Sequence, residues 1–255
     1  MAVHAANHVR AVLGELRYQP TAKRVRAMLG GETVADTTRA LLVWEPQRVV
    51  PQYAVPEDDV LAELLLTQVA AFGVHSTDGE VLTVRATGGD RLGAGFRPAD
   101  PDLAGHIVLD FAAFDEWFEE EERIISHPRD PFTRIDVRRS TRHVRIERDG
   151  RVLAESTRPR LLFETHLPAR FYLPREDVHT ELLRPSDTVT TCAYKGEAAY
   201  WSLDLDGHTV QDIAWSYPQP LTDAVEVRDL LCFFDERVDV IVDGVPWERP
   251  QTPWS

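Results

Sequence analysis

Cysteine is scarce in this chain, and the scarcity limits which metal sites and which compartments need to be considered. The 255 residues contain only two cysteines, Cys192 and Cys232. Two thiolates alone do not complete a zinc site, and neither His166 nor His179 belongs to a grouping with zinc-ligand spacing. A disulfide framework would also need more cysteines. We therefore expect two reduced thiols, no metal and no cofactor.

Long apolar runs and an excess of positive charge are missing as well. No run approaches the roughly 18 apolar residues of a membrane span. The N-terminal segment MAVHAANHVRAVLGELRYQP lacks the uninterrupted apolar stretch of a signal peptide. With 28 basic and 42 acidic residues, the formal charge of −14 repels phosphate backbones. The sequence therefore predicts a cytoplasmic protein that binds neither membranes nor nucleic acids, and it leaves the oligomeric state open.

Short strand-like segments dominate what is present. Apolar and β-branched runs alternate with turn residues in the pattern of antiparallel sheets. Gly30-Gly31 lies between two such runs and predicts a hairpin, because glycine enters the primed turns without steric cost. Leu41–Trp44 predicts a buried strand, whereas the prolines of VVPQYAVPEDDV (49–60) favour an edge strand or a loop. The sequence thus predicts a mainly β protein.

Few helices are expected, and two can be placed. Val9, Val12, Leu13 and Leu16 recur at helical spacing ahead of Pro20, which predicts a short N-terminal helix. The second helix is predicted over Leu61–Ala71, which is rich in helix-forming residues.

The chain also contains an internal repeat. VRAMLGGETVADTTRALLVWE (25–45) aligns without a gap on VRIERDGRVLAESTRPRLLFE (144–164). Glu45 meets Glu164, and both Arg39 and Arg158 follow a threonine. A repeat of this length implies two structurally similar domains. We predict a divergent N-terminal repeat over 1–132 and a C-terminal repeat over 133–255.

Chemistry is densest in CAYKGEAAYW (192–201), which combines a thiol, an amine, a glycine and three aromatic rings. A turn at Asp206-Gly207 would return Trp215-Ser216-Tyr217-Pro218 beside it. Strand residues two apart share a face, so the rings of the two strands could line one cavity. The N-terminal repeat carries His75–Gly79 and Gly95–Pro98 at the corresponding places. The pocket is therefore predicted in the C-terminal repeat.

Nine residues make up the predicted ligand site. They are Tyr172, Asp177, Cys192, Tyr194, Lys195, Tyr200, Trp215, Tyr217 and Arg158. Lys195 or Arg158 would neutralise an anionic group, and the rings would cover an aromatic or apolar body. Each residue also has a purely structural interpretation: the rings as sheet core, Cys192 as an inert apolar residue, and Arg158 as half of an ion pair.

Three functions remain open at this point. The first is a binding protein for a small molecule, anionic or aromatic. The second is an enzyme in which Cys192 is a nucleophile or redox centre and Lys195 or a nearby histidine sets its protonation. The third is a structural or partner-binding protein, for which the divergent N-terminal repeat would be the interface.

The C-terminal half carries a series of motifs that resembles a known bacterial family. They are T-R-x-x-L-x-x-E from Thr157, Y-x-P-x-x-D-V from Tyr172, P-S-x-T-x-x-T-C-x-Y-K-G-x-A-x-Y-W from Pro185, D-x-A-W-x-Y-P-x-P-L from Asp212 and F-x-x-R-V-D-V-x-V-D-G from Phe234. Together they resemble domain of unknown function 427, and the N-terminal half resembles a divergent copy of it.

This resemblance implies two tandem β-tent-like domains, in which antiparallel sheets lean together, with a few short helices. The β-tent is also the fold of zinc-binding exchange-factor chaperones and of R-type methionine sulfoxide reductases, but the cysteine pairs that bind zinc in those proteins are absent here. The family is sometimes labelled a nucleotidyltransferase. The paired acidic metal ligands and the Gly-Ser motif of that activity are not visible in this sequence.

Overall fold

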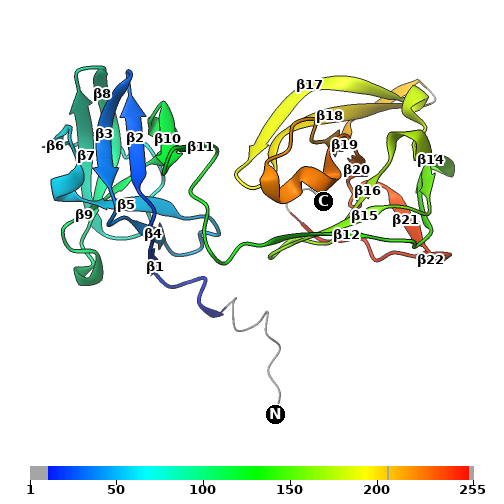
Figure 1. Ribbon diagram of the computed structural model, residues 1–255, viewed down its shortest axis with the longest axis horizontal. Coiled ribbons are helices and arrows are strands. Elements are labelled where there is room, and N and C mark those ends of the chain that lie inside the picture. The colour runs from blue at the N-terminus through cyan, green and yellow to red at the C-terminus, as the bar shows by residue number, and fades with distance from the viewer. Residues whose placement is uncertain (1–10, 206, 253–255) are drawn as a thin grey trace, which may run out of the picture. The chain divides into compact units, whose positions relative to one another are not determined.

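The fold is mainly β, as predicted (Figure 1). The computed structural model describes residues 11–205 and 207–252. The chain divides into two units, Met1–Asp130 and Pro131–Ser255. Each unit contains one seven-stranded and one four-stranded antiparallel sheet. In the described part of the chain, no helix has the length and apolar character needed to cross a membrane.

In the N-terminal unit both sheets are antiparallel throughout. Across the larger sheet the strands follow in the order β1 (Arg17–Pro20), β4 (Leu41–Trp44), β5 (Gln52–Pro56), β9 (His106–Leu109), β8 (Gly89–Pro98), β7 (Gly79–Ala86) and β6 (Glu63–Leu66). The smaller sheet has the order β11 (Glu122–Ile124), β10 (Glu116–Glu119), β2 (Val25–Leu29) and β3 (Glu32–Thr37).

The C-terminal unit repeats this plan. Its larger sheet has the order β12 (Ile135–Arg139), β15 (Arg160–Glu164), β16 (Arg170–Leu173), β20 (Leu231–Phe233), β19 (His208–Ser216), β18 (Gly196–Leu205) and β17 (Leu183–Cys192). Its smaller sheet has the order β14 (Arg151–Ser156), β13 (Val144–Arg148), β21 (Asp239–Val242) and β22 (Val245–Pro246). The shared strand order confirms that the chain is a tandem repeat of one β-tent-like fold.

Short 3₁₀-helices join several of the strands. They are η1 (Glu57–Asp59), η2 (Pro101–Leu103), η3 (Phe111–Ala113), η4 (Arg175–Asp177), η5 (Thr180–Leu182) and η6 (Thr222–Val227). The helix predicted over Leu61–Ala71 is wrong, because residues 63–66 form strand β6 and pair with β7. Cross-strand pairing and the packing of Leu64 on the core outweigh helix propensity there. Of the predicted N-terminal helix, Val9 lies outside the described residues and Val12–Gly14 form a turn.

Proline placement explains a second difference from the sequence prediction. The segment 49–60 was expected at a sheet edge, but its strand β5 lies between β4 and β9. Pro51 precedes the strand and Pro56 is its last residue, so neither interrupts the hydrogen bonds in the middle of the ladder. Proline therefore brackets a central strand here.

The predicted tight hairpins are present. Gly30 and Gly31 join β2 to β3 with φ values of +60° and +83°, the left-handed region that glycine enters freely. In the C-terminal unit, Leu205 pairs with His208 across the turn between β18 and β19. Asp206 lies outside the described residues, and Gly207 has φ +80°. This second hairpin brings Trp215 beside Tyr200.

Two apolar clusters lie on opposite faces of the large C-terminal sheet. Phe171, Leu173 and Ile213 pack on the small sheet through Val144 and Ile146. Alternating residues of the same strands point the other way, where a second cluster forms around Tyr172 and Trp215 and is covered in part by η6. This second face, away from the small sheet, carries the pocket.

Candidate functional site

One row of cross-strand partners forms the floor of the C-terminal pocket. Tyr172 of β16 pairs with Cys232 of β20, Cys232 with Trp215 of β19, and Trp215 with Tyr200 of β18. Directly opposed residues in antiparallel strands project from the same face of the sheet. The register therefore places four large or polarisable side chains side by side.

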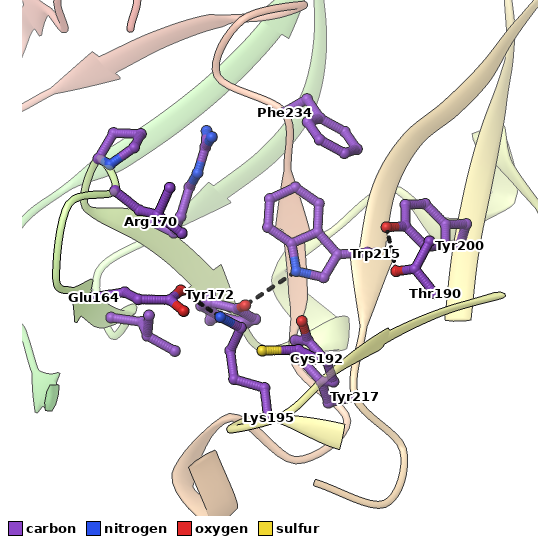
Figure 2. Close-up of a pocket in the computed structure, with 13 residues that line it drawn as sticks. Glu164, Arg170, Tyr172, Thr190, Cys192, Lys195, Tyr200, Trp215, Tyr217 and Phe234 are labelled. Carbon is purple, nitrogen blue, oxygen red and sulfur yellow. Dashed lines mark hydrogen bonds and ion pairs between the residues drawn. The ribbon is translucent and has the colours of Figure 1, made fainter. Parts of the chain in front are cut away.

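Around this row the structure has a pocket of about 320 Å³ (Figure 2). Its walls come from β15 to β19, from the loops after β15, β17 and β19, and from the segment after β20. The lining residues are Leu162, Glu164, Leu167, Pro168, Arg170, Tyr172, Thr190, Cys192, Lys195, Tyr200, Trp215, Tyr217 and Phe234. Six of the nine residues predicted from the sequence are thus brought together: Tyr172, Cys192, Lys195, Tyr200, Trp215 and Tyr217.

Hydrogen bonds and ring contacts hold the aromatic side chains in place. The Trp215 indole Nε1 donates to the Tyr172 hydroxyl at 3.0 Å. Phe234 lies 4.5 Å from the Trp215 ring, centroid to centroid, and 6.4 Å from the Tyr200 ring. The Tyr200 and Thr190 hydroxyls are hydrogen-bonded at 2.8 Å. Because these rings support one another, the floor is preorganised for a flat apolar group.

A buried ion pair occupies one wall. Lys195 Nζ binds Glu164 Oε2, and the two side chains are only 9% and 10% exposed. The lysine loop is fixed by Gly196, which has φ +96°, and by the Leu221 amide, which donates to the Lys195 carbonyl at 3.1 Å. The sequence predicts that Lys195 or Arg158 neutralises an anionic ligand. In the structure its charge is already balanced by Glu164.

A second ion pair, formed by Arg170, borders the pocket beside the aromatic floor. The Arg170 guanidinium donates to both carboxylate oxygens of Glu236, at 2.9 and 2.6 Å, and approaches Asp235 Oδ2 at 3.8 Å. It also lies 5.6 Å from the Trp215 ring centroid. Burial, with the neighbouring Glu236, raises the pKa of Asp235 to about 7 even though Arg170 lowers it. Two acidic groups thus share one arginine.

The raised pKa of Asp235 predicts a pH effect on the C-terminal repeat. A carboxyl with a higher pKa in the folded state binds more protons folded than unfolded, so the free energy of unfolding should fall as pH rises from about 4 to about 7. Asp235→Asn should remove this slope and stabilise the repeat at pH 8, as measured by urea unfolding. A slope that is unchanged in the variant would contradict the assignment.

Three predicted residues lie outside the pocket. Arg158 pairs with Asp177 at 2.9 Å, and the Ser156 hydroxyl donates to Asp177 at 2.7 Å. Arg39 and Asp59 form the same pair at 2.7 Å in the N-terminal repeat, which fits the structural interpretation of Arg158. Tyr194 is buried and is not among the lining residues. Asp177 thus ties η4 to β14 and does not line the pocket, whereas Tyr172 of the same motif does.

Sequence reasoning did not include several lining residues in the site. They are Leu162, Glu164, Leu167, Pro168, Arg170, Thr190 and Phe234. The sequence does single out Glu164, because the internal repeat aligns it with Glu45, so both repeats carry a glutamate at this position. A residue that both copies share is explained by the common fold, so this signal alone does not assign Glu164 to the pocket. The others depend on strand register and loop paths, which local sequence does not specify.

The cysteines are both free, and their surroundings differ. Cys192 is half-buried and lines the pocket, whereas Cys232 is fully buried and burial raises the pKa of its thiol well above the usual value. Iodoacetamide should therefore label Cys192 in the native protein and Cys232 only after unfolding. Peptide mass spectrometry before and after urea treatment measures this, and early labelling of Cys232 would contradict the buried placement.

The corresponding row of the N-terminal repeat is Ala54, Val108, Phe96 and Val81. Phe96, not Gly95, therefore corresponds to Trp215, so the sequence alignment was one residue off. The His75 ring stacks on Phe96 with centroids 4.0 Å apart and an interplanar angle of 7°. An imidazole thus lies directly on the ring that takes the place of Trp215.

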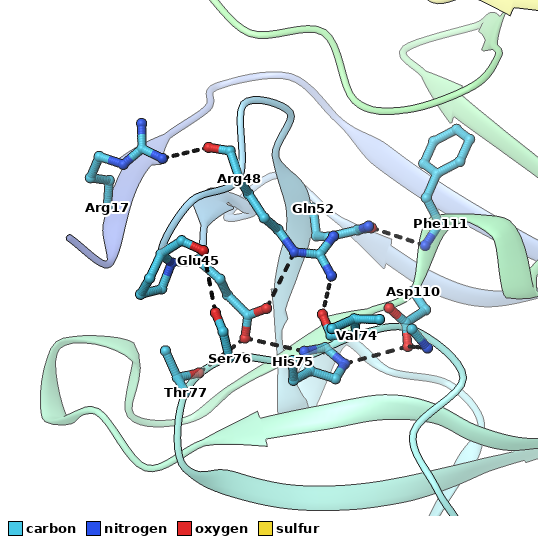
Figure 3. A network of polar contacts seen from close by, with 12 residues as sticks. Arg17, Glu45, Arg48, Gln52, Val74, His75, Ser76, Thr77, Asp110 and Phe111 are labelled. Carbon is cyan, nitrogen blue, oxygen red and sulfur yellow. Dashed lines mark hydrogen bonds and ion pairs between the residues drawn. The ribbon is translucent and has the colours of Figure 1, made fainter. Parts of the chain in front are cut away.

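Two carboxylates hold this imidazole (Figure 3). His75 Nδ1 lies 3.2 Å from Glu45 Oε1, and Nε2 lies 3.5 Å from Asp110 Oδ2. Burial lowers the pKa of His75, but the contacts with Asp110 and Glu45 outweigh it and raise that pKa to about 9. His75 is therefore an imidazolium at neutral pH, bound inside its own repeat.

Comparison with known proteins gives one family. The profile described as domain of unknown function (DUF427) matches residues 17–71 and 136–244. A search of curated proteins finds no match. The two matched segments cover strands of both repeats, including the Lys195 loop and the Trp215 strand.

Proposed function

The chain belongs to the domain of unknown function 427 family, and we propose that its C-terminal repeat is a binding module for a small molecule with a planar, largely apolar body. The ligand would lie on the aromatic floor formed by Trp215 and Phe234. Concave sites with apolar walls and a few convergent polar groups are the usual form of small-molecule sites.

The observation that carries this proposal is that the pocket has unused hydrogen-bonding groups. Within residues 11–205 and 207–252, the Tyr217 hydroxyl has no hydrogen-bond partner, although the residue is mostly buried. The Tyr172 hydroxyl accepts from Trp215, and its own proton has no acceptor in the same part of the chain. Both residues line the pocket, so a bound ligand is well placed to complete the hydrogen bonds of these two hydroxyls.

The charges of the pocket favour a neutral ligand over an anion. Lys195 is paired with Glu164, and Arg170 is paired with Glu236. An anionic group would have to displace Glu164 from Lys195 and leave that carboxylate buried without a partner, which is costly. The sequence suggested an anionic or an aromatic ligand. Of these two types, we propose an uncharged aromatic ligand.

One observation favours a second candidate function. Cys192 lines the same pocket, three residues before Lys195, so a bound electrophile could be attacked by its sulfur. An iodoacetamide reaction much faster than that of a free thiol would favour this enzyme, and an ordinary rate would favour the binding module. We place either function in the cytoplasm, because an acidic chain with two free thiols suits a reducing compartment.

A rim substitution tests the proposed function. Thr190 lines the pocket from an exposed position on β17, so Thr190→Trp should fill the pocket without disturbing the core. A thermal-shift screen of small metabolites against the intact protein should find a ligand, which adds about 2.7 kcal/mol of stability at about a hundred times its dissociation constant. That shift should disappear in the variant.

The control for this screen lies one residue away. Thr191 is exposed on the opposite face of the same strand, so Thr191→Trp should keep the full ligand-induced shift. If every ligand stabilises both variants equally, binding takes place elsewhere and the proposed function is wrong.

A further inference from the structure

The two repeats present the same site in two states, one filled and one open. Glu45 ends the segment after β4 and Glu164 ends β15, and the strands have matching registers, with Leu41 opposite Ala54 and Arg160 opposite Tyr172. The carboxylate and the floor ring therefore have the same relative placement in both repeats: Glu45 with Phe96, and Glu164 with Trp215. In the first repeat the His75 imidazole lies between them.

His75 thus serves as an internal ligand. Its ring stacks on the floor aromatic and its Nδ1 lies within reach of the carboxylate, the two contacts that a planar nitrogen heterocycle would make. In the second repeat the cationic partner of the carboxylate is the Lys195 ammonium, which supplies the charge but no ring. The space beside Trp215 remains as the pocket.

A change of one flanking residue alters the charge that the site prefers. Asp110 follows β9 and donates its amide to Ala94, and Phe234 follows β20 and donates its amide to Ile213, so the two are structurally equivalent. The first repeat has two carboxylates, Glu45 and Asp110, which hold the His75 cation, and Arg48 Nε also lies 3.4 Å from Glu45. The second replaces one carboxylate by an apolar ring and neutralises the other with Lys195.

From this comparison we infer that the ligand of the C-terminal pocket is a neutral, planar nitrogen heteroaromatic that stacks on Trp215 and donates a ring N–H to Glu164. Its ring acceptor nitrogen is reached by the Tyr217 hydroxyl, which is without a partner among the described residues. The inference rests on the proposed function and narrows it to one chemical class.

Calorimetric titration of the intact protein with three probes tests this class. Benzimidazole carries a ring N–H and a ring acceptor, indene is its hydrocarbon counterpart, and benzoate is a planar anion. Benzimidazole should bind at least about tenfold more tightly than the other two, since a hydrogen bond to a charged group is worth about that factor or more. Glu164→Gln combined with Lys195→Gln, a neutral pair, should abolish the preference, while Gln52→Asn in the other repeat should keep it.

A second experiment tests the internal ligand directly. His75→Ala should destabilise the N-terminal repeat, and millimolar imidazole should restore its stability, whereas tetrahydrofuran at equal concentration should not. Rescue should be lost when Glu45→Gln is added. The absence of rescue would show that His75 is not a model for a ligand.

The outcomes distinguish a failure of the heteroaromatic ligand class from a failure of the proposed binding function. Indene or benzoate binding as tightly as benzimidazole, with loss of binding in Thr190→Trp, overturns the heteroaromatic class and leaves the binding module standing. Benzimidazole that fails to bind at millimolar concentration likewise overturns the inference. Ligands that bind regardless of Thr190→Trp overturn the proposed function as well.

Discussion

Arg170→Met should destabilise the C-terminal repeat by about 3–5 kcal/mol, the cost typical of removing one partner of a buried ion pair. The Glu236 side chain is fully buried and has Arg170 as its charged partner, and Asp235 is nearly as buried beside it. Methionine keeps most of the apolar length of the side chain but leaves both acids without a cation. Urea unfolding followed by methyl NMR, in which each repeat gives its own signals, measures the loss.

An exposed ion pair is the matched control for this substitution. Arg158 forms hydrogen bonds to Asp177 of similar length, but its side chain is 57% exposed. Arg158→Met should therefore cost no more than about 1 kcal/mol. Equal losses in the two variants would contradict the view that burial, rather than pairing itself, makes Arg170 important.

Raising the pH from about 6.5 to about 9 should destabilise the N-terminal repeat by about 3 kcal/mol through His75 alone. The pKa of this histidine is higher in the folded than in the unfolded chain. Its contribution is therefore complete below the unfolded pKa and is lost as pH rises through the folded value. Urea unfolding at a series of pH values, followed by the methyl signals of this repeat, measures the slope.

His75→Gln isolates the effect. Glutamine can still donate to Glu45 or Asp110 but does not titrate, so the stability of the variant should be nearly flat between those pH values. The C-terminal repeat has Lys195 at the corresponding carboxylate and provides an internal comparison within the same sample. A slope that persists in the variant would assign the titration to another group.

The fold was predictable to the extent that local signals and the repeat determine it. Gly30-Gly31 specified a hairpin, and the aligned segments specified two domains of one fold. The helix prediction for Leu61–Ala71 failed because helix propensity is a local property. Strand β6 forms instead through its pairing with β7, which is a long-range interaction. The prediction of an edge strand or loop at β5 failed because a proline destabilises a sheet only where its missing N–H interrupts the ladder. The prolines here lie at the ends of the strand.

The pocket was predictable where alternation along a strand and one hairpin were sufficient. Those two rules bring Trp215, Tyr217 and Tyr200 to one face. Glu164 and Arg170 come from strands that are distant in the sequence, so their position depends on sheet order. The position of the His75 ring on Phe96 was not predicted. A sequence alignment shows which residue is replaced, but it does not show which side chain occupies the corresponding space in the N-terminal repeat.

A crystallographic soak with a set of small planar heterocycles tests the central claim most directly. The account predicts ligand density stacked on Trp215, within hydrogen-bond distance of Glu164 and the Tyr217 hydroxyl, and no ligand beside Phe96 while His75 is in place. Ligand density that appears only at other surfaces, with the C-terminal pocket empty at saturating concentration, would contradict it.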